Sequence, residues 1–417
     1  MSKTVLKVEN LNMHYETIAG NVSAVRDVSF ELKEGESFGL VGESGCGKTS
    51  VAMSLLQLQA DNAKISSGSI KLNDEELVTK TEKELRKIRW KGISIVFQGA
   101  MNAWNPVVKI GEQIREAIRE HYPNNTKDEN SEKIKKLFDI VGLDHSIMNR
   151  FPHELSGGMK QRAVIALALS CDPKVLIADE PTTALDVTVQ QQILALLNKI
   201  QEERKMSILF ISHDLGVVNE IADYIYVMKD GKIIEHGKKD QIFNNPQDTY
   251  TKQLVSFQNK IRKHEENKEV EILKIKDLKV WYPIKKGIFK KTVDYVKAID
   301  VINFTLNQKE TLGIVGESGS GKTSLVLAIL KLISSSGKIE FDKIDLNLVK
   351  KNKLKSIRKN IQIVFQDPYS SLSPRMNVEE ILNEGIDVHF PKYATSEKKQ
   401  ILKDILKEAG MNYERDH

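Results

Sequence analysis

A glycine-rich loop that occurs twice is the feature that most constrains this chain of 417 residues. The stretch GLVGESGCGKTS covers residues 39–50, and GIVGESGSGKTS covers residues 313–324. Each copy has the spacing G-x-x-x-x-G-K-T of a phosphate-binding loop. Glycines let the backbone wrap around a phosphate with its N–H groups pointing inward, and a following helix presents its positive end to the anion. We predict a strand, this loop and a helix in both places, which makes a chance match a poor explanation.

In the first copy, ESFGLV (36–41) is predicted to be the strand and TSVAMSLLQL (49–58) the helix. We expect the Lys48 ammonium to reach the β- and γ-phosphates of a nucleotide and the Thr49 hydroxyl to bind Mg²⁺. A cysteine at a helix start can have a lowered pKa, but the second copy has serine there, so the backbone is expected to matter more than the thiol. The nucleotide-binding residues predicted in this loop are Gly42, Glu43, Ser44, Gly45, Cys46, Gly47, Lys48, Thr49 and Ser50.

The loops belong to a larger duplication. Four landmarks recur in the same order: LNMHY (11–15) with LKVWY (278–282), the two loops, IVFQGAMNAWNP (95–106) with IVFQDPYSSLSP (363–374), and Gly142 with Gly410. The last two pairs share an offset of 268 positions, which indicates a duplicated domain. We therefore predict a complete first domain at residues 1–256, a charged linker at 257–271, and the N-terminal part of a second domain at 272–417.

Three further motifs follow the first loop. LSGGMKQR (155–162) opens an apolar helix, which suits either a phosphate-binding helix start or a plain serine N-cap. KVLIADEPTTALD (174–186) is a buried strand ending in Asp179, suited to Mg²⁺, and Glu180, suited to polarising an attacking water; a structural acidic turn is the alternative. SILFISHD (207–214) is another strand, and His213 at its carboxyl end suits a phosphate sensor, although a lone histidine is usually structural.

Together with Tyr15 and Gln98, these motifs resemble the nucleotide-binding domain of an ABC transporter. The resemblance implies an α/β P-loop NTPase fold of the ABC type with a helical subdomain, repeated in tandem with an incomplete second copy, and an ATPase that uses ATP and Mg²⁺. It implies that Tyr15 stacks on adenine, that Gln98 contacts Mg²⁺, the attacking water and a membrane subunit, and that His213 contacts the γ-phosphate. Ser156, Gly157 and Gly158 would contact ATP held by a facing domain, and Asp186 would communicate across that dimer.

The implied sites fall into three groups. The catalytic residues are Glu180, His213 and Gln98. In the second unit the ATP-binding residues are Tyr282, Gly316, Ser318, Gly319, Ser320, Gly321, Lys322, Thr323, Ser324 and Gln366. The Mg²⁺ ligands are Thr49, Gln98, Asp179, Thr323 and Gln366.

Residues 101–114, 245–255 and 281–304 resemble segments of the oligopeptide/dipeptide importer ATPases. This implies peptide import with two transmembrane permease subunits and, indirectly, an extracytoplasmic peptide-binding protein. Some relatives carry an iron–sulfur cluster after the first core domain, but the chain has only Cys46 and Cys171, so none is expected. Two alternatives stay open: a soluble tandem ABC ATPase acting on the ribosome or nucleic acid, and a remnant that binds nucleotide with little hydrolysis.

Composition limits where the chain works. Its most apolar stretch, AVIALAL (163–169), is far shorter than the ~20 residues of a membrane span, and no signal-type segment opens the chain. We expect a peripheral protein on the cytoplasmic side of the membrane. The net charge of +5 is mostly lysine on polar helices without interleaved aromatics, so no nucleic-acid partner is expected.

The second unit shows no LSGG motif, acidic strand end or histidine. The shared offset would put the counterpart of Ser156 at position 424, seven beyond His417. Because ABC sites pair one domain's loop with another's signature, the resemblance implies that a second ATPase domain or chain must supply a signature for hydrolysis. We interpret the sequence as an incomplete gene product and expect its half-domain to be unstable or prone to aggregation.

Overall fold

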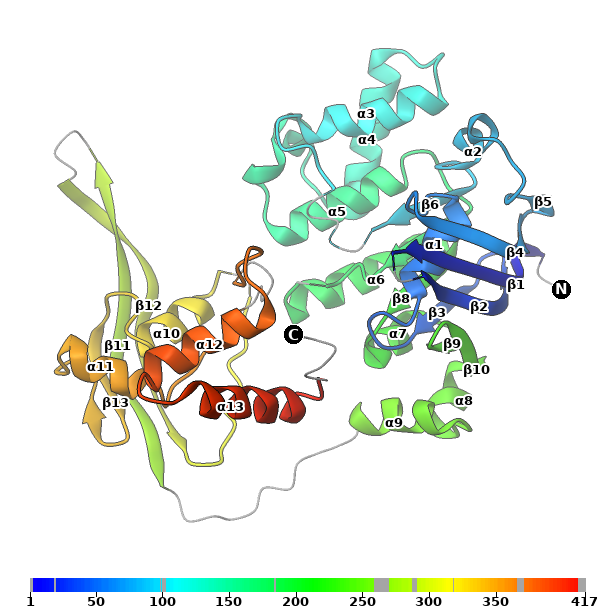
Figure 1. The fold of residues 1–417 in the computed structure, drawn as a ribbon. Coiled ribbons are helices and arrows are strands. Elements are labelled where there is room, and N and C mark those ends of the chain that lie inside the picture. Colours follow the sequence, from blue (N-terminus) through cyan, green and yellow to red (C-terminus); the bar gives the residue numbers. More distant parts are fainter. Residues whose placement is uncertain are drawn as a thin grey trace. The chain divides into compact units, whose positions relative to one another are not determined.

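The structure is a computed structural model, and it describes residues 3–18, 20–97, 99, 103–183, 185–258, 270–286, 291–317, 319–365 and 371–411. The chain divides into two compact units, Met1–His264 and Glu265–His417 (Figure 1). Each unit contains its own hydrophobic core.

A six-stranded sheet in the order β10-β9-β3-β8-β7-β6 forms the centre of the first unit. Its strands are β3 (Ser37–Val41), β6 (Ile93–Val96), β7 (Val175–Asp179), β8 (Ser207–Ser212), β9 (Tyr224–Lys229) and β10 (Lys232–Lys238). All pairs are parallel except β9 with β10. Every residue of β3, β7 and β8 is buried, as expected for parallel strands covered on both faces. These are the short apolar runs that the sequence predicted as strands.

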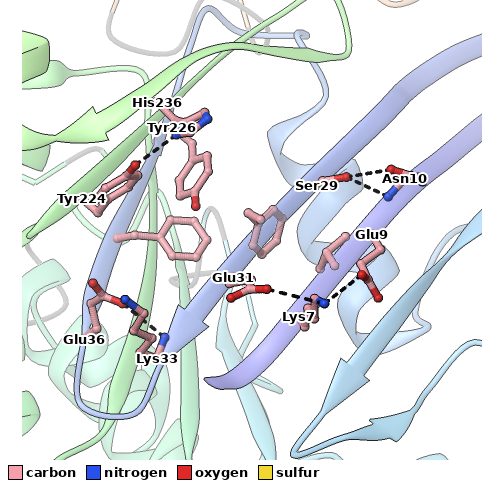
Figure 2. Close-up of a pocket in the computed structure, with 13 residues that line it drawn as sticks. Lys7, Glu9, Asn10, Ser29, Glu31, Lys33, Glu36, Tyr224, Tyr226 and His236 are labelled. Atoms are coloured by element: carbon pink, nitrogen blue, oxygen red, sulfur yellow. Dashed lines mark hydrogen bonds and ion pairs between the residues drawn. The ribbon is translucent and has the colours of Figure 1, made fainter. Parts of the chain in front are cut away.

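A second, antiparallel sheet in the first unit has the order β2-β1-β4-β5. It contains β1 (Thr4–Thr17), β2 (Gly20–Lys33), β4 (Ala63–Leu72) and β5 (Glu75–Glu76). An aromatic cluster joins it to the central sheet: the ring centroids of Phe30 and Phe38 are 5.0 Å apart, those of Phe38 and Tyr226 5.0 Å, and those of Tyr226 and His236 5.3 Å (Figure 2). Such ring contacts add to the stability that burial provides. They therefore fix the two sheets against each other.

Helices complete the first unit. They are α1 (Lys48–Leu56), α2 (Glu82–Ile88), α3 (Ile110–His121), α4 (Lys127–Val141), α5 (Gly157–Ala168), α6 (Val187–Arg204), α7 (Leu215–Ile221), α8 (Lys239–Asn244) and α9 (Thr249–Gln258), with short 3₁₀ turns η2 (His145–Asn149) and η3 (Pro152–Glu154). Helices α3 and α4 with η2 form a helical segment, in line with the helical subdomain that the resemblance implies. Within the described ranges, no helix has the length and apolar character needed to cross a bilayer.

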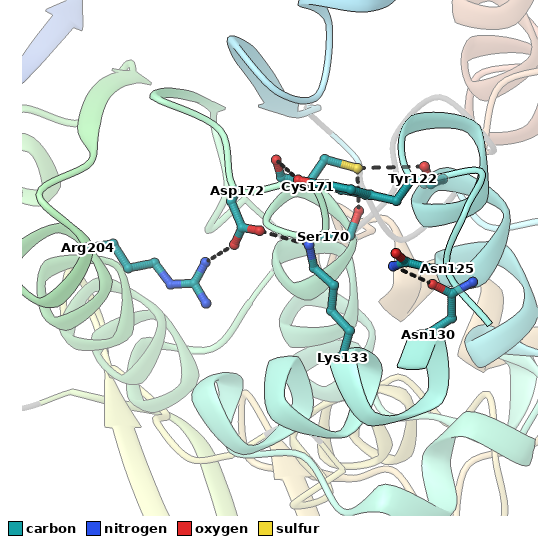
Figure 3. Close-up of polar contacts among 9 residues, drawn as sticks. Tyr122, Asn125, Asn130, Lys133, Ser170, Cys171, Asp172 and Arg204 are labelled. Atoms are coloured by element: carbon teal, nitrogen blue, oxygen red, sulfur yellow. Dashed lines mark hydrogen bonds and ion pairs between the residues drawn. The ribbon is translucent and has the colours of Figure 1, made fainter. Parts of the chain in front are cut away.

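The turn between α5 and β7 ties the helical segment to the sheet-covering helix α6 (Figure 3). In this turn the Asp172 carboxylate accepts hydrogen bonds from Lys133 Nζ of α4 at 2.8 Å and from Arg204 Nη1 of α6 at 2.9 Å. The hydroxyl of Tyr122, just after α3, donates to the Cys171 carbonyl at 3.3 Å. One turn thus contacts α4, α6 and the residue that follows α3.

The second unit begins with the same kind of antiparallel sheet, in the order β12-β11-β13-β14. Its strands are β11 (Glu271–Lys286), β12 (Lys291–Asn307), β13 (Ser336–Phe341) and β14 (Ile344–Asp345), and its helices are α10 (Lys322–Ile329), α11 (Lys351–Arg358), α12 (Val378–His389) and α13 (Thr395–Glu408). The helix predicted after the second loop is therefore confirmed as α10.

The strand predicted before the second loop was wrong. Residues 311–317 belong to no strand, and Val315 is 90% exposed. In the first unit, β3 receives its hydrogen bonds from β8 on one side and β9 on the other. The described part of the second unit holds no strand in either place. An apolar run forms a strand only where a neighbour satisfies its backbone groups, so the sequence pattern alone was insufficient.

Candidate active site

The first glycine-rich loop runs from the end of β3 to the start of α1 and curls around the ammonium group of Lys48. Lys48 Nζ donates to the carbonyl oxygens of Gly42 at 2.7 Å and Glu43 at 2.8 Å. A Cβ at position 42 would lie 2.1 Å from the Met228 carbonyl oxygen, so only glycine fits this close approach of β9. Burial raises the pKa of the Cys46 thiol, which opposes the reactive alternative considered for it.

A cavity of about 410 Å³ opens above this loop. Its size lies within the range of small-molecule sites. Its lining brings together residues from the loop, from β1 and β2, from the end of β7 and from the β9–β10 turn: Tyr15, Val22, Ser23, Ala24, Arg26, Ser44, Gly45, Gly47, Lys48, Thr49, Ser50, Glu180, Asp230 and Gly231. Tyr15 reaches it from β1, with its hydroxyl 3.1 Å from Ser50 Oγ.

Glu180 and His213 meet beside this cavity because β7 and β8 are neighbours and both end at the same sheet edge. Glu180 Oε1 lies 2.9 Å from His213 Nδ1, and Glu180 Oε2 accepts a hydrogen bond from the Thr183 hydroxyl at 3.0 Å. The Glu180 backbone has φ of 47°, a left-handed conformation that is uncommon for a side-chain-bearing residue. Such local strain is found preferentially at functional sites.

Asp179, at the end of β7, has the environment of a cation ligand. Its side chain is buried, and burial raises its pKa to about 6, while a hydrogen bond with Thr49 opposes that rise. Within the described residues its Oδ1 atom has no hydrogen-bond partner. A buried carboxylate oxygen left unpaired beside a hydroxyl matches the oxygen donors that Mg²⁺ prefers. The residues present therefore fit this ion.

The LSGG segment begins α5. Ser156 Oγ accepts a hydrogen bond from the Met159 N–H at 3.3 Å, so the serine caps the helix, and it is exposed. Asp186 caps α6 in the same way, accepting from the Val189 N–H at 3.0 Å. A Cβ on Gly158 would lie 2.9 Å from Val189 Cγ1, so this position has little room for a side chain. The predicted contacts of Ser156–Gly158 and Asp186 across a dimer stay predictions.

The second loop reproduces the local geometry of the first. Lys322 Nζ donates to the carbonyl oxygens of Gly316 at 2.6 Å and Glu317 at 2.7 Å, and the Tyr282 hydroxyl lies 3.2 Å from Ser324 Oγ. Unlike the first loop, it is mostly exposed. Among the predicted site residues, Gln98, Ser318 and Gln366 lie outside the part of the chain that the structure describes.

One contact of the first loop was missed by the sequence analysis. The Glu43 N–H donates to the hydroxyl of Tyr250, in α9, at 3.0 Å. The two residues are 207 positions apart, and no local pattern relates them. Tyr250 stood within a segment noted only for its resemblance to importer ATPases.

Comparison with known proteins decides the family, because residues 25–183 and 299–417 match the ABC transporter family. The chain belongs to the ABC transporter family. It is 41% identical to the peptidoglycan transport ATP-binding protein YejF of Agrobacterium fabrum, over 99% of this chain and 76% of that protein. It is also 38% identical to the glutathione import ATP-binding protein GsiA of Salmonella typhimurium, over 93% of this chain and 68% of that protein.

Solved structures agree with this family. The dimeric bacterial ABC transporter cassette MJ0796 matches with a TM-score of 0.52 and 28% identity, covering 56% of this chain and 98% of the cassette. The same cassette has also been solved bound to ADP and Pi. The predicted ABC-type α/β P-loop NTPase fold is therefore confirmed, and this ABC protein is an ATPase that binds ATP.

Proposed function

We propose that this ABC protein powers the import of peptides or peptide-like molecules through partner permease subunits. Supporting observations are the relatives named for peptidoglycan transport and glutathione import, which align with more than nine-tenths of the chain. The single structural observation that carries hydrolysis is the 2.9 Å contact between Glu180 and His213 beside the lysine-containing loop.

The chemistry follows from these positions. When ATP enters the cavity, Lys48 exchanges its two carbonyl partners for phosphate oxygens, and the loop N–H groups surround the phosphate. Glu180 polarises the water that attacks the γ-phosphate. With both ring nitrogens protonated, His213 donates from Nδ1 to Glu180 and orients it, and it donates from Nε2 to the γ-phosphate. His213 is about half exposed, so it remains accessible to the nucleotide.

Thr49 and Asp179 are the described residues that would hold Mg²⁺, with Gln98 as a further proposed ligand. When bound, the ion neutralises charge on the phosphate oxygens. A nearby cation also favours the ionised form of Asp179, whose pKa burial has raised to about 6. The site therefore suits Mg²⁺-ATP better than free ATP.

For the permease contact we propose a surface groove of about 640 Å³ between α2 and α3. Its lining combines apolar with charged and polar side chains, which suits an amphipathic helix of a partner: Leu58, Arg86, Arg89, Trp90, Val108, Gln113, Glu116, Glu120 and Leu167 are among its lining residues. Under this proposal the protein would work at the inner face of a membrane, and a peptide-binding protein would act on it only through the permeases.

Glu180→Gln in the full chain tests hydrolysis. Removing the general base should lower turnover by about 10²-fold or more while ATP binding remains, because the loop is intact. Glu202→Gln, an exposed glutamate on α6, is the matched control and should behave as the parent. Turnover of Glu180→Gln equal to that of Glu202→Gln would contradict the assignment.

The substrate is tested by uptake. Cells deleted for this gene should lose import of labelled tripeptides, and parent protein but not Glu180→Gln should restore it. Normal uptake in the deletion, with co-sedimentation of the protein on ribosomes, would instead support the ribosome-associated alternative.

A further inference from the structure

The first loop is held from outside by elements near the end of its unit. The Gly231 N–H, in the β9–β10 turn, donates to the Cys46 carbonyl at 3.0 Å, and the Tyr250 hydroxyl accepts from the Glu43 N–H at 3.0 Å. Tyr250 is 6% exposed, and Lys229 Nζ lies 4.8 Å from its ring centroid. The contact is thus made by a fixed, packed side chain rather than by a mobile surface group.

The geometry of one peptide group shows what this contact does. The Gly42 carbonyl and the Glu43 N–H belong to the same planar trans peptide, so they point in opposite directions. Lys48 holds the carbonyl end at 2.7 Å, and Tyr250 holds the N–H end at 3.0 Å. When Lys48 turns to ATP phosphates, the Tyr250 bond is the one of these two that still orients the peptide.

Tyr250 is itself positioned by a short polar turn. Glu235 of β10 accepts hydrogen bonds from the N–H groups of Gln247 at 2.7 Å and Asp248 at 3.0 Å. The Asp248 carboxylate then accepts from the Tyr250 N–H at 2.7 Å. The start of α9 is therefore fixed to β10, and β10 pairs with β9 beside the loop. Burial also raises the pKa of Tyr250, so the hydroxyl stays neutral at working pH.

We propose that Tyr250 is a positioning residue for ATP binding, which keeps the Gly42–Glu43 peptide oriented while Lys48 moves from the loop to the phosphates. The inference rests on the proposed function insofar as ATP binds at the first loop. We expect the first loop to contact ATP equally in the ground state and the transition state. A looser loop should therefore weaken ATP binding without lowering kcat.

The test is Tyr250→Phe in the full chain, with Lys322→Ala in every variant to silence the second loop. One net hydrogen bond is lost, so the KM for ATP and the Kd for a fluorescent ATP analogue should rise about two- to tenfold, with kcat within twofold. Hydrogen–deuterium exchange of the peptide containing Gly42–Gly45 should quicken. Tyr224→Phe removes a hydroxyl bonded instead to His236 at 3.1 Å, and should change none of these.

Lys48→Ala separates the two claims. If it leaves ATP binding intact, the assignment of ATP to the first loop fails. If it abolishes binding while Tyr250→Phe matches Tyr224→Phe, the positioning role is overturned. A Tyr250→Phe variant with lower kcat and a lower unfolding midpoint, but an unchanged KM, overturns it as well, since that is what a purely structural tyrosine would give.

Discussion

At the scale of single residues, the buried carboxylate of Asp179 lowers the stability of the folded protein at a position proposed to bind Mg²⁺. Its ordinary pKa of 3.8 rises to about 6 in the folded protein because burial disfavours its charge. The folded state then binds the proton more tightly than the unfolded state. The energetic cost is absent below pH 3.8, grows as pH rises to about 6, and stays constant above it, at about 3 kcal/mol.

Asp179→Asn should therefore raise the unfolding midpoint of nucleotide-free protein in EDTA at pH 7.5, and the gain should shrink at pH 5. Unfolding followed by circular dichroism at both values checks this. Asp144→Asn is a control of opposite sign. Hydrogen bonds with Ser146 lower the pKa of Asp144, so loss of this carboxylate should destabilise the protein, and most at neutral pH. A gain for Asp179→Asn that is equal at both pH values would argue against the buried charge as its source.

At the scale of elements, Asp172 connects α4 to α6 through two ion pairs. Its side chain is 52% exposed, so each pair contributes at most about 1 kcal/mol and is screened by salt. Asp172→Asn should lower the unfolding midpoint slightly in 50 mM salt and have little effect in 1 M salt. Asp172→Ala should be worse in both, since φ of 56° is a left-handed conformation that asparagine tolerates better than alanine.

Thermal unfolding at the two salt concentrations measures these differences. Glu132→Gln is the matched control, because it breaks an ion pair with Lys135 that lies within α4 alone. If Asp172→Asn and Glu132→Gln lower the unfolding midpoint equally, the ion pairs between α4 and α6 contribute no more stability than an ion pair within α4. If the loss from Asp172→Asn is independent of salt, charge is not its cause.

Elements with a strong local signal could be predicted from the sequence, and contacts between distant elements could not. The apolar runs of β7 and β8 and the glycine spacing before α1 are local, so they located Asp179, Glu180, His213 and Lys48. Their meeting followed from the shared edge of a parallel sheet. Tyr250 beside Glu43 and Asp172 between two helices depend on how the chain returns on itself. The strand expected before the second loop failed for the same reason, because the strands that would pair with it are not local either.

At the scale of the whole molecule, the second unit exposes strand-like apolar segments that the first unit buries. Val315 is 90% exposed and Val364 is 91% exposed. The corresponding segments of the first unit, β3 and β6, are paired in its central sheet. Unpaired apolar segments of this type promote association between chains. The exposed surface, rather than the ATP site, should therefore control how the full chain behaves at high concentration.

Val315→Lys combined with Val364→Lys should reduce light scattering of concentrated full-length protein, because two charges oppose edge-to-edge pairing. ATP binding at the first loop should be unchanged, since that loop belongs to the other unit. Ile18→Lys, which alters an exposed apolar residue at a hairpin end of the first unit, should leave scattering as it is. Equal scattering for the double variant and Ile18→Lys would show that association uses another surface. A weakened ATP affinity in the double variant would show instead that the second unit contributes to ATP binding at the first loop.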